Sequence, residues 1–235
     1  MTALGPKTAA EPAKATAAFR LNGVELLADL SGALVWPARR TLIVADLHLE
    51  KGSGFARRGS PLPPYDTRAT LANLAAVLDR YRPDRVVCLG DSFHDPEAGD
   101  RLSPRDRATL RRMTAAHDWI WIRGNHDPAP PAGLGGRAAA EETIGALRFR
   151  HEAAPGPVAG EVSGHFHPKI GLSVRGRQVG GRCFVEDGRR VILPAFGAYA
   201  GGLDARNPVI AGLFRDGFTA HLIGRTRIRS LRLRP

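Results

Sequence analysis

The sequence has no long apolar run, and nothing at its start looks like an export signal. No stretch of the 235 residues approaches the roughly 18 consecutive apolar residues of a membrane helix. This absence excludes a protein that spans a membrane by helices, and we expect a soluble protein with no membrane partner. Residues 1–17 carry proline and lysine and lack the apolar core of a signal peptide, so we expect a disordered leader there.

Cysteine is also scarce. Cys88 and Cys183 are the two cysteines, and they form no spaced framework of the kind that disulfide scaffolds or zinc modules require. Each lies in an apolar run, where cysteine behaves as a small hydrophobic side chain. We therefore expect two core residues, and a cytoplasmic location fits them.

Lysine is rare, whereas arginine is abundant. Only four of the 34 basic residues are lysine, and the formal net charge is +11. A charge of this size indicates a polyanionic partner such as nucleic acid. A GC-rich genome would produce the same arginine-rich composition without selection for binding, so the charge leaves both explanations open.

The pattern of strands predicts one α/β domain over residues 18–224. Residues 18–36 alternate apolar and polar side chains around two glycine-containing turns, which predicts a hairpin before a strand at 41–46. The second half consists of short apolar segments between glycine-containing turns: LRFRH, GEVSG, IGLSVRG, GRCFVED, RRVILPA, PVIAGLF and TAHLIG. We expect these segments to be strands that stack on the first half.

Two helices are expected in the first half, each followed by a strand. Leucines at helical spacing predict one helix with Asp66 and Thr67 as N-cap residues and Pro83 beyond its end. Ser103 followed by Pro104 predicts the start of a second helix. The strands RVVCLG and WIWIRG follow these helices, as in an alternating α/β pattern.

Polar residues follow the predicted strands at each strand end. They are Asp46 and His48 after TLIVA, Asp91 after VVCLG, Asn125, His126 and Asp127 after WIWIRG, His151 after LRFR, and His165 and His167 after GEVSG. Ligands bind beyond the carboxyl ends of strands in open α/β sheets, so carboxylate, imidazole and amide groups converge on one edge. Each motif alone is weak, but the ordered combination predicts a metal site.

The ordered motifs D-x-H, G-D, G-N-H-D, H and G-H-x-H resemble the calcineurin-like metallophosphoesterase superfamily. The resemblance implies an α/β fold, a four-layer α-β-β-α sandwich of two mixed sheets flanked by helices, and a dinuclear phosphoester hydrolase. The residues that it implies as ligands of one metal ion are Asp46, His48, Asp91 and His167. Asp91 then bridges to a second ion, whose other ligands are Asn125, His151 and His165.

The same resemblance implies catalytic residues. His126 resembles the histidine that faces the scissile phosphate, and Asp95 is the carboxylate expected to orient it. Arg123, directly before GNHD, is expected either to touch the reacting phosphate or to pair with a carboxylate. A histidine that stabilises the phosphoryl oxygens or protonates the leaving oxygen contributes about 10²–10⁴-fold to the rate.

The chemistry explains the residue types. Two cations about 3.5–4 Å apart clamp an in-line displacement and activate a water molecule. A His/Asp/Asn shell without thiolate suits Mn²⁺, which we expect, with Fe or Zn²⁺ as alternatives.

Two longer stretches narrow the resemblance. DLHLEKGSGFARRGSPLPPYDTRATLANL and GHFHPKIGLSVRGRQVGGRCFVEDGRRVILPAFGAYAGGLD are similar to DNA-ligase-associated metallophosphoesterases, a bacterial family of DNA-damage-response endonucleases. The resemblance implies DNA as the substrate and an ATP-dependent DNA ligase and a helicase as partners. The segment LPAFGAYAGG is expected either as a loop at the rim of the site or as a tight turn that needs small residues.

Several cations are candidates for nucleic-acid contacts. Lys51, Arg57 and Arg58 are expected in the loop after the first metal motif, where they either hold flanking phosphates or form a solvated charge run. The basic tail, residues 225–235, carries five arginines and has the same two explanations.

Two other functions compete with a nuclease. A hydrolase of a small phosphoester or nucleotide-lipid diphosphate would need an apolar helical lid between the motifs, but residues 91–125 offer one short helix. A non-enzymatic scaffold on the same fold would have lost ligands or the catalytic histidine, and all of these positions are present here.

Overall fold

The computed structural model describes residues 15–60, 62–174 and 176–234. Residues 1–14 of the expected leader lie outside this part of the chain. Strand β1 (Thr16–Leu21) begins within the expected leader, so residues 16 and 17 belong to the folded domain.

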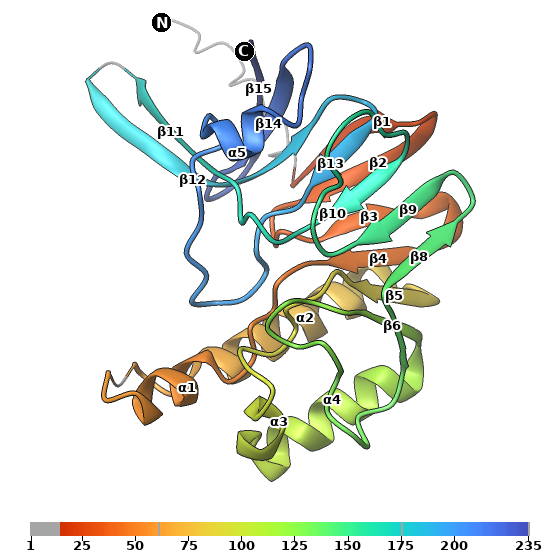
Figure 1. Ribbon diagram of the computed structural model, residues 1–235, viewed down its shortest axis with the longest axis vertical. Coiled ribbons are helices and arrows are strands. Elements are labelled where there is room, and N and C mark those ends of the chain that lie inside the picture. Colours follow the sequence, from red (N-terminus) through yellow and green to blue (C-terminus); the bar gives the residue numbers. More distant parts are fainter. Residues whose placement is uncertain (1–14, 61, 175, 235) are drawn as a thin grey trace, which may run out of the picture.

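Two mixed β-sheets stack face to face (Figure 1). The strands of the first sheet, in spatial order, are β1, β2 (Val24–Asp29), β3 (Leu34–Trp36), β4 (Thr41–Val44), β5 (Arg85–Cys88), β6 (Asp118–Ile122) and β7 (Arg137–Ala139). Neighbours from β1 to β4 are antiparallel, and neighbours from β4 to β7 are parallel. The carboxyl ends of β4, β5 and β6 therefore meet at one edge.

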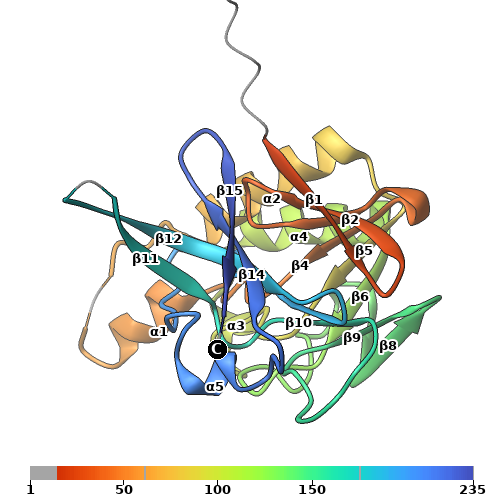
Figure 2. The ribbon, with the colours of Figure 1, turned by 90° about the horizontal axis from the view of Figure 1, so that it is seen from above.

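The second sheet has the same mixed character. Its spatial order is β15 (Ile228–Leu233), β14 (Phe218–Ile223), β12 (Arg177–Glu186), β13 (Arg190–Ile192), β10 (Glu161–Ser163), β9 (Leu147–Arg150) and β8 (Glu141–Ile144). Strands β9, β10 and β13 are parallel neighbours. Strand β11 (Lys169–Val174) pairs with β12, and the two form a hairpin that projects from the body (Figure 2).

Three apolar clusters hold the layers together. The cluster between the sheets joins side chains such as Ile43 and Ile120 of the first sheet to Phe149 and Phe184 of the second. A second cluster packs α2 (Asp66–Tyr81) and α4 (Pro104–Ala116) on the outer face of the first sheet (Figure 1). A third lies on the outer face of the second sheet under α5 (Pro208–Ala211). The expected α-β-β-α sandwich is confirmed, with its last layer reduced to one helical turn.

One of the two expected helix starts is confirmed and the other is wrong. Helix α4 has the expected cap, because Ser103 Oγ accepts from the Asp106 amide at 3.1 Å. The N-cap of α2 is Tyr65 and not Asp66 or Thr67. Those two side chains accept instead from the amides of Gly52 and Glu50, at 3.0 and 2.8 Å, and so attach α1 (Lys51–Arg57) to α2.

The segment PVIAGLF was expected to be a strand, and that expectation is wrong. It forms α5, with Pro208 in the first turn and Asn207 as a cap that accepts from the Val209 amide at 3.0 Å. The asparagine and proline are a helix-start signal that outweighs the apolar pattern of so short a segment.

Much of the basic tail belongs to the second sheet. Strand β15 pairs with β14 along its whole length, from Ile228 to Leu233. Leu231 and Leu233 pack against the third apolar cluster, while Arg229 and Arg232 are exposed. The tail therefore ends the domain as an edge strand. Among the helices of the described chain, none has the length and apolarity that a membrane crossing needs.

Candidate metal centre

The carboxyl ends of strands from both sheets bring the expected ligands together. Asp46, Asp91 and Asn125 follow β4, β5 and β6, while His151 and His165 follow β9 and β10. The amide of His165 donates to Asp46 Oδ2 at 2.9 Å, so the two sheets are joined by a hydrogen bond at this edge. The described residues contain two groups with metal-ligand geometry: Asp46, His48 and His167, and Asp91, His151 and His165.

In the first group, two imidazoles and one carboxylate oxygen face one another. His48 Nε2 lies 3.2 Å from His167 Nε2, and His167 Nε2 lies 3.5 Å from Asp46 Oδ1. Asp46 is fully buried, yet its Oδ1 has no hydrogen-bond partner among the described residues. A buried carboxylate oxygen without a partner is unfavourable unless a cation compensates it.

In the second group, several electron-rich atoms converge on His151 Nε2. His151 Nδ1 donates to the Leu89 carbonyl oxygen at 2.8 Å, which leaves Nε2 as the ring's free site. Asn125 Oδ1 lies 2.8 Å from Nε2, His165 Nδ1 lies 3.1 Å away, and Asp91 Oδ1 lies 3.5 Å away. These electron-rich atoms would repel one another unless a proton or a cation lay between them.

The backbone at the ligands is strained. The candidate ligands with positive φ are Asp46 (52°), His48 (44°), Asp91 (45°), His165 (68°) and His167 (47°). Non-glycine residues rarely adopt this region, which costs of order 1–3 kcal/mol each and persists only where the surroundings impose it. The clustering of this strain at the ligands indicates that their directions are functionally constrained.

The buried charges shift the pKa values of the ligands. Burial, with the nearby His167, lowers the pKa of His48 to about 3, so its ring is neutral and able to bind a metal. Burial also opposes the charged form of His151, but the hydrogen bond to Asp91 and the charges of Asp46 and Asp91 prevail and raise its pKa to about 9. The same contact outweighs burial at Asp91 and lowers its pKa to about 2. Without a metal, a proton on His151 occupies a place that suits a cation.

The donor set fits two divalent ions. Metal–nitrogen bonds of about 2.1 Å separate two nitrogens of a tetrahedral site by about 3.4 Å. The imidazole pairs here are separated by 3.2 and 3.1 Å. Imidazole, carboxylate and amide ligands without thiolate suit Mn²⁺, Fe or Zn²⁺.

His126 lies beside these groups and is positioned by the backbone. Its Nδ1 donates to the His94 carbonyl oxygen at 2.9 Å, and its Nε2 lies 3.9 Å from Asp91 Oδ2. The expected orienting carboxylate, Asp95, instead accepts two hydrogen bonds from Arg101, at 2.6 and 2.9 Å. The expectation for Asp95 is therefore wrong, because a backbone carbonyl has taken its place.

His94 is a site residue that the sequence analysis missed. Its ring stacks on His126 with centroids 5.6 Å apart and on Phe55 at the same distance. It is buried, and neither ring nitrogen has a hydrogen-bond partner among the described residues. Burial and the nearby charge of Lys51 lower its pKa, so the ring is neutral. Its only sequence signal was its position three residues after Asp91.

The expected cations are placed unequally. Lys51 and Arg57 belong to helix α1, with Arg58 as its C-cap, and not to a loop. Arg57 forms an exposed ion pair with Glu97. Lys51 is half-buried and lies 6.0 Å over the Phe55 ring, and its charge is near enough to lower the pKa of His94. Arg123 is exposed, and within the described chain its side chain makes no ion pair.

The segment LPAFGAYAGG, residues 193–202, lies against the first ligand group. The Phe196 amide donates to the Ala45 carbonyl at 2.8 Å, and the Gly197 amide donates to the Asp46 carbonyl at 3.2 Å. A Cβ on Gly197 would overlap the Leu47 carbonyl oxygen, so only glycine fits there. Both expectations for this segment therefore hold, since it borders the site and requires a small residue.

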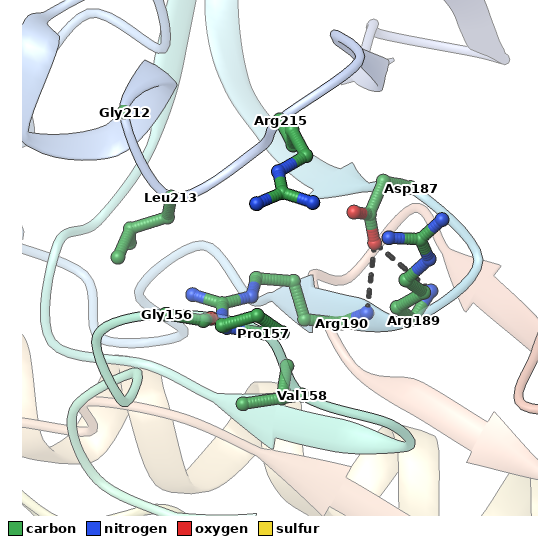
Figure 3. A pocket seen from close by; sticks show the side chains of 9 residues that line it. All are labelled: Gly156, Pro157, Val158, Asp187, Arg189, Arg190, Gly212, Leu213 and Arg215. Carbon is green, nitrogen blue, oxygen red and sulfur yellow. Dashed lines mark hydrogen bonds between the residues drawn. The ribbon is translucent and has the colours of Figure 1, made fainter.

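A pocket far along the second sheet is not part of this centre (Figure 3). It has a volume of about 210 Å³ and contains Arg190, the first residue of β13, whose partner in β10 is Glu161, the first residue of that strand. The metal-binding groups follow the opposite ends of the strands. The Arg190 guanidinium is occupied by the carbonyl oxygens of Ala154 and Gly156, at 3.0 and 2.7 Å.

The fold and the site define a metal-dependent hydrolase of phosphoesters. Residues 39–185 match the calcineurin-like phosphoesterase family, and this match covers more than half of the chain. The protein belongs to that family.

Three solved structures are similar to this chain to different degrees. The crystal structure of Pseudomonas putida nuclease MPE is 29% identical, covers 92% of this chain and 100% of its own, and has a TM-score of 0.73. The E. coli phosphoesterase YfcE is 12% identical over 81% of this chain and 97% of its own, with a TM-score of 0.40. A Streptococcus pneumoniae TIGR4 protein described as a predicted phosphoesterase is 14% identical over 82% of this chain and 97% of its own, with a TM-score of 0.32. A search among curated proteins gave no match.

Proposed function

We propose that this protein is a DNA phosphodiesterase, an endonuclease of the DNA damage response that uses two Mn²⁺ ions. The observation that carries the proposal is the pair of adjacent ligand groups, with His126 beside them and part of its side chain exposed. Two divalent ions, when bound, supply Lewis acidity toward a phosphoryl oxygen and lower the pKa of a water molecule.

The residues of the chain divide the remaining work. The ligands of the first group are Asp46, His48 and His167, and those of the second are Asp91, Asn125, His151 and His165. Asp91 would serve as a ligand of both ions. His126 holds one proton on Nδ1 for the His94 carbonyl. In its cationic form it would carry a second proton on Nε2, with which it would stabilise the reacting phosphate or which it would pass to the leaving oxygen.

Two observations favour a polynucleotide over a small phosphoester. The His126 side chain is 43% exposed, and the segment between the motifs contributes α3 (Ala98–Arg101) and α4, with no apolar lid over the site. The similarity to a nuclease over nearly the whole chain points the same way. A hydrolase of a small phosphoester or nucleotide-lipid diphosphate remains the alternative. A cytoplasmic location, a DNA ligase partner and a helicase partner stay predictions from the sequence resemblance.

The decisive experiment presents the purified protein with Mn²⁺ to single-stranded, duplex and gapped DNA, to RNA, and to simple phosphodiesters. We expect Mn²⁺-dependent cleavage of DNA within the strand, as circular single-stranded DNA would report. Asp91→Ala protein, purified in parallel, controls for a contaminating nuclease. Hydrolysis of small phosphoesters without any cleavage of DNA would replace the proposal by its alternative.

A further inference from the structure

A second pocket opens directly beside the metal centre. It has a volume of about 360 Å³, and His167, a ligand of the first group, forms part of its wall. The rest of the wall includes Asn73 of α2, Lys169 of β11, Arg182 of β12 and residues 195–198 and 200–201. Its size falls within the range of ligand pockets. The roles proposed above for the metal centre leave this pocket without a function.

Two cations in this pocket lie side by side without a counter-charge. Lys169 and Arg182 are directly opposite each other in the pairing of β11 with β12. Like charges in that position destabilise a sheet. Within the described chain neither residue makes an ion pair, and no carboxylate lines the pocket. Asp204 forms an isolated β-bridge with Lys169, which is a backbone contact. Its carboxylate pairs with Arg206 at 2.6 Å.

The two cations have different roles. The Arg182 guanidinium donates to the carbonyl oxygens of Ala195 and Ser31, both at 2.9 Å, so it holds the loop in place. The Lys169 ammonium makes no such contact with residues 15–60, 62–174 or 176–234. Its stem is long enough to follow a ligand, and an ammonium binds phosphate as a point charge. Lys169 is therefore the cation that a ligand would meet.

The wall of the pocket is rigidly attached to the metal centre. The Gly197 amide bonds to the Asp46 carbonyl, and the Ala198 amide bonds to Thr70 Oγ1 at 3.1 Å. A Cβ on Gly202 would overlap the His167 carbonyl oxygen, so the two backbones are in direct contact. A group held in the pocket is thus held at a constant distance from the first ligand group.

We propose that this pocket binds a phosphate of the DNA strand next to the scissile phosphate, with Lys169 as its charged contact and Asn73 as a hydrogen-bond donor. The inference rests on the proposed function, since it assigns one subsite of that same centre. It explains why two unpaired cations are kept beside a metal ligand. It also predicts that changes in the pocket affect the cleavage of polynucleotides and not the hydrolysis of a diester that lacks neighbouring phosphates.

The test compares three variants with the wild-type protein. Lys169→Ala removes the charge, and Ala200→Glu places a carboxylate in the pocket wall. Arg111→Ala is the matched control, since it removes one exposed positive charge from α4, on the outer face of the first sheet. Each protein is assayed with Mn²⁺ on single-stranded DNA at several salt concentrations and on bis(p-nitrophenyl) phosphate, and its thermal unfolding is compared with that of the wild type.

We expect Lys169→Ala and Ala200→Glu to lower kcat/KM on DNA relative to the small diester by about 3–10-fold, chiefly through KM. The salt slope of log KM should fall by about 0.7 in Lys169→Ala, the value for one contact with a single strand. Equal behaviour of the two pocket variants and Arg111→Ala would overturn the subsite. A wild-type protein that cleaves no polynucleotide would overturn the proposed function, so the two failures are distinct.

Discussion

His48 Nε2 and His167 Nε2 lie 3.2 Å apart, although 119 positions separate the two residues in the sequence. His48 follows a strand of the first sheet and His167 follows a strand of the second, and both have a left-handed backbone conformation. Two imidazole nitrogens at this distance share either a proton or a cation. We propose a shared cation, and the metal analyses of the first two predictions would detect it.

Asp91 is the ligand whose removal should matter most. Its carboxylate contacts His151 and accepts from the His126 amide at 2.9 Å, so it joins the second ligand group to His126. Asp91→Ala should lower metal content and activity together, by more than the roughly 10–100-fold typical of a residue that only supports a ligand. Elemental analysis and turnover on one preparation measure both. Asp187→Ala is the control, since Asp187 lines the pocket of Figure 3, which is not part of the metal centre. Two bound ions with near-normal turnover would contradict the bridging role.

His126 should affect the rate and not the metals. His126→Ala should keep both ions, because its Nδ1 bonds a carbonyl and its Nε2 is close to no more than one carboxylate. It should lose about 10²–10⁴-fold in kcat on a diester with a poor leaving group. The loss should be smaller on a nitrophenyl diester, whose leaving group needs no proton. Loss of metal in this variant would make His126 a ligand.

Asp95 should contribute to stability more than to catalysis. Asp95→Asn weakens two hydrogen bonds with Arg101, and we expect a loss of about 1–2 kcal/mol in the free energy of unfolding. If Asp95 oriented His126 instead, the rate would fall by about 10²-fold or more. Chemical denaturation and initial rates measure the two effects. Asp106→Asn, which changes a carboxylate outside the centre, is the comparison.

Lys51 and Arg58 should contribute more to DNA affinity than Arg57. Each phosphate contact adds about 0.7 to the slope of log affinity against log salt for a single strand. Glu97 already neutralises Arg57, so Lys51→Ala with Arg58→Ala should lower the slope by about 1.4, and adding Arg57→Ala should change it little. Fluorescence anisotropy with a labelled oligonucleotide measures the slope. A triple variant with the wild-type slope would exclude α1 from the nucleic-acid surface.

Both cysteines should be unreactive in the folded protein. Burial raises the pKa of Cys183 to about 12 and raises that of Cys88 well above its usual value. The thiolate is the reactive form of cysteine. Because a raised pKa means that the thiolate forms only at higher pH, almost no thiolate is present at pH 8. An aromatic disulfide reagent that releases a yellow thiolate when it reacts with a thiol should therefore detect no thiol in the native protein at pH 8 and two thiols in denaturant. Rapid labelling of the native protein would show that one site is accessible.

Local patterns were enough to find the candidate metal ligands and most strands. Asp46 and His48 come directly after an apolar strand, and so do Asp91 and the GNHD motif. Because parallel strands bring their carboxyl ends to one edge of the sheet, these side chains meet there. The start of α4 was equally local, because the Ser103 cap and Pro104 are adjacent. The sequence by itself therefore determined which residue types converge and what chemistry they support.

Only the tertiary structure decided the contacts between distant segments. A backbone carbonyl orients His126, and a carbonyl has no side-chain signature in a sequence. Glu97 neutralises Arg57 because the short helices α1 and α3 pack together. Arg101 binds Asp95, which lies just before α3. Lys169 and Arg182 are 13 positions apart and become neighbours through the register of β11 with β12. Register and packing depend on the whole core, and so no local pattern could place these two cations beside His167.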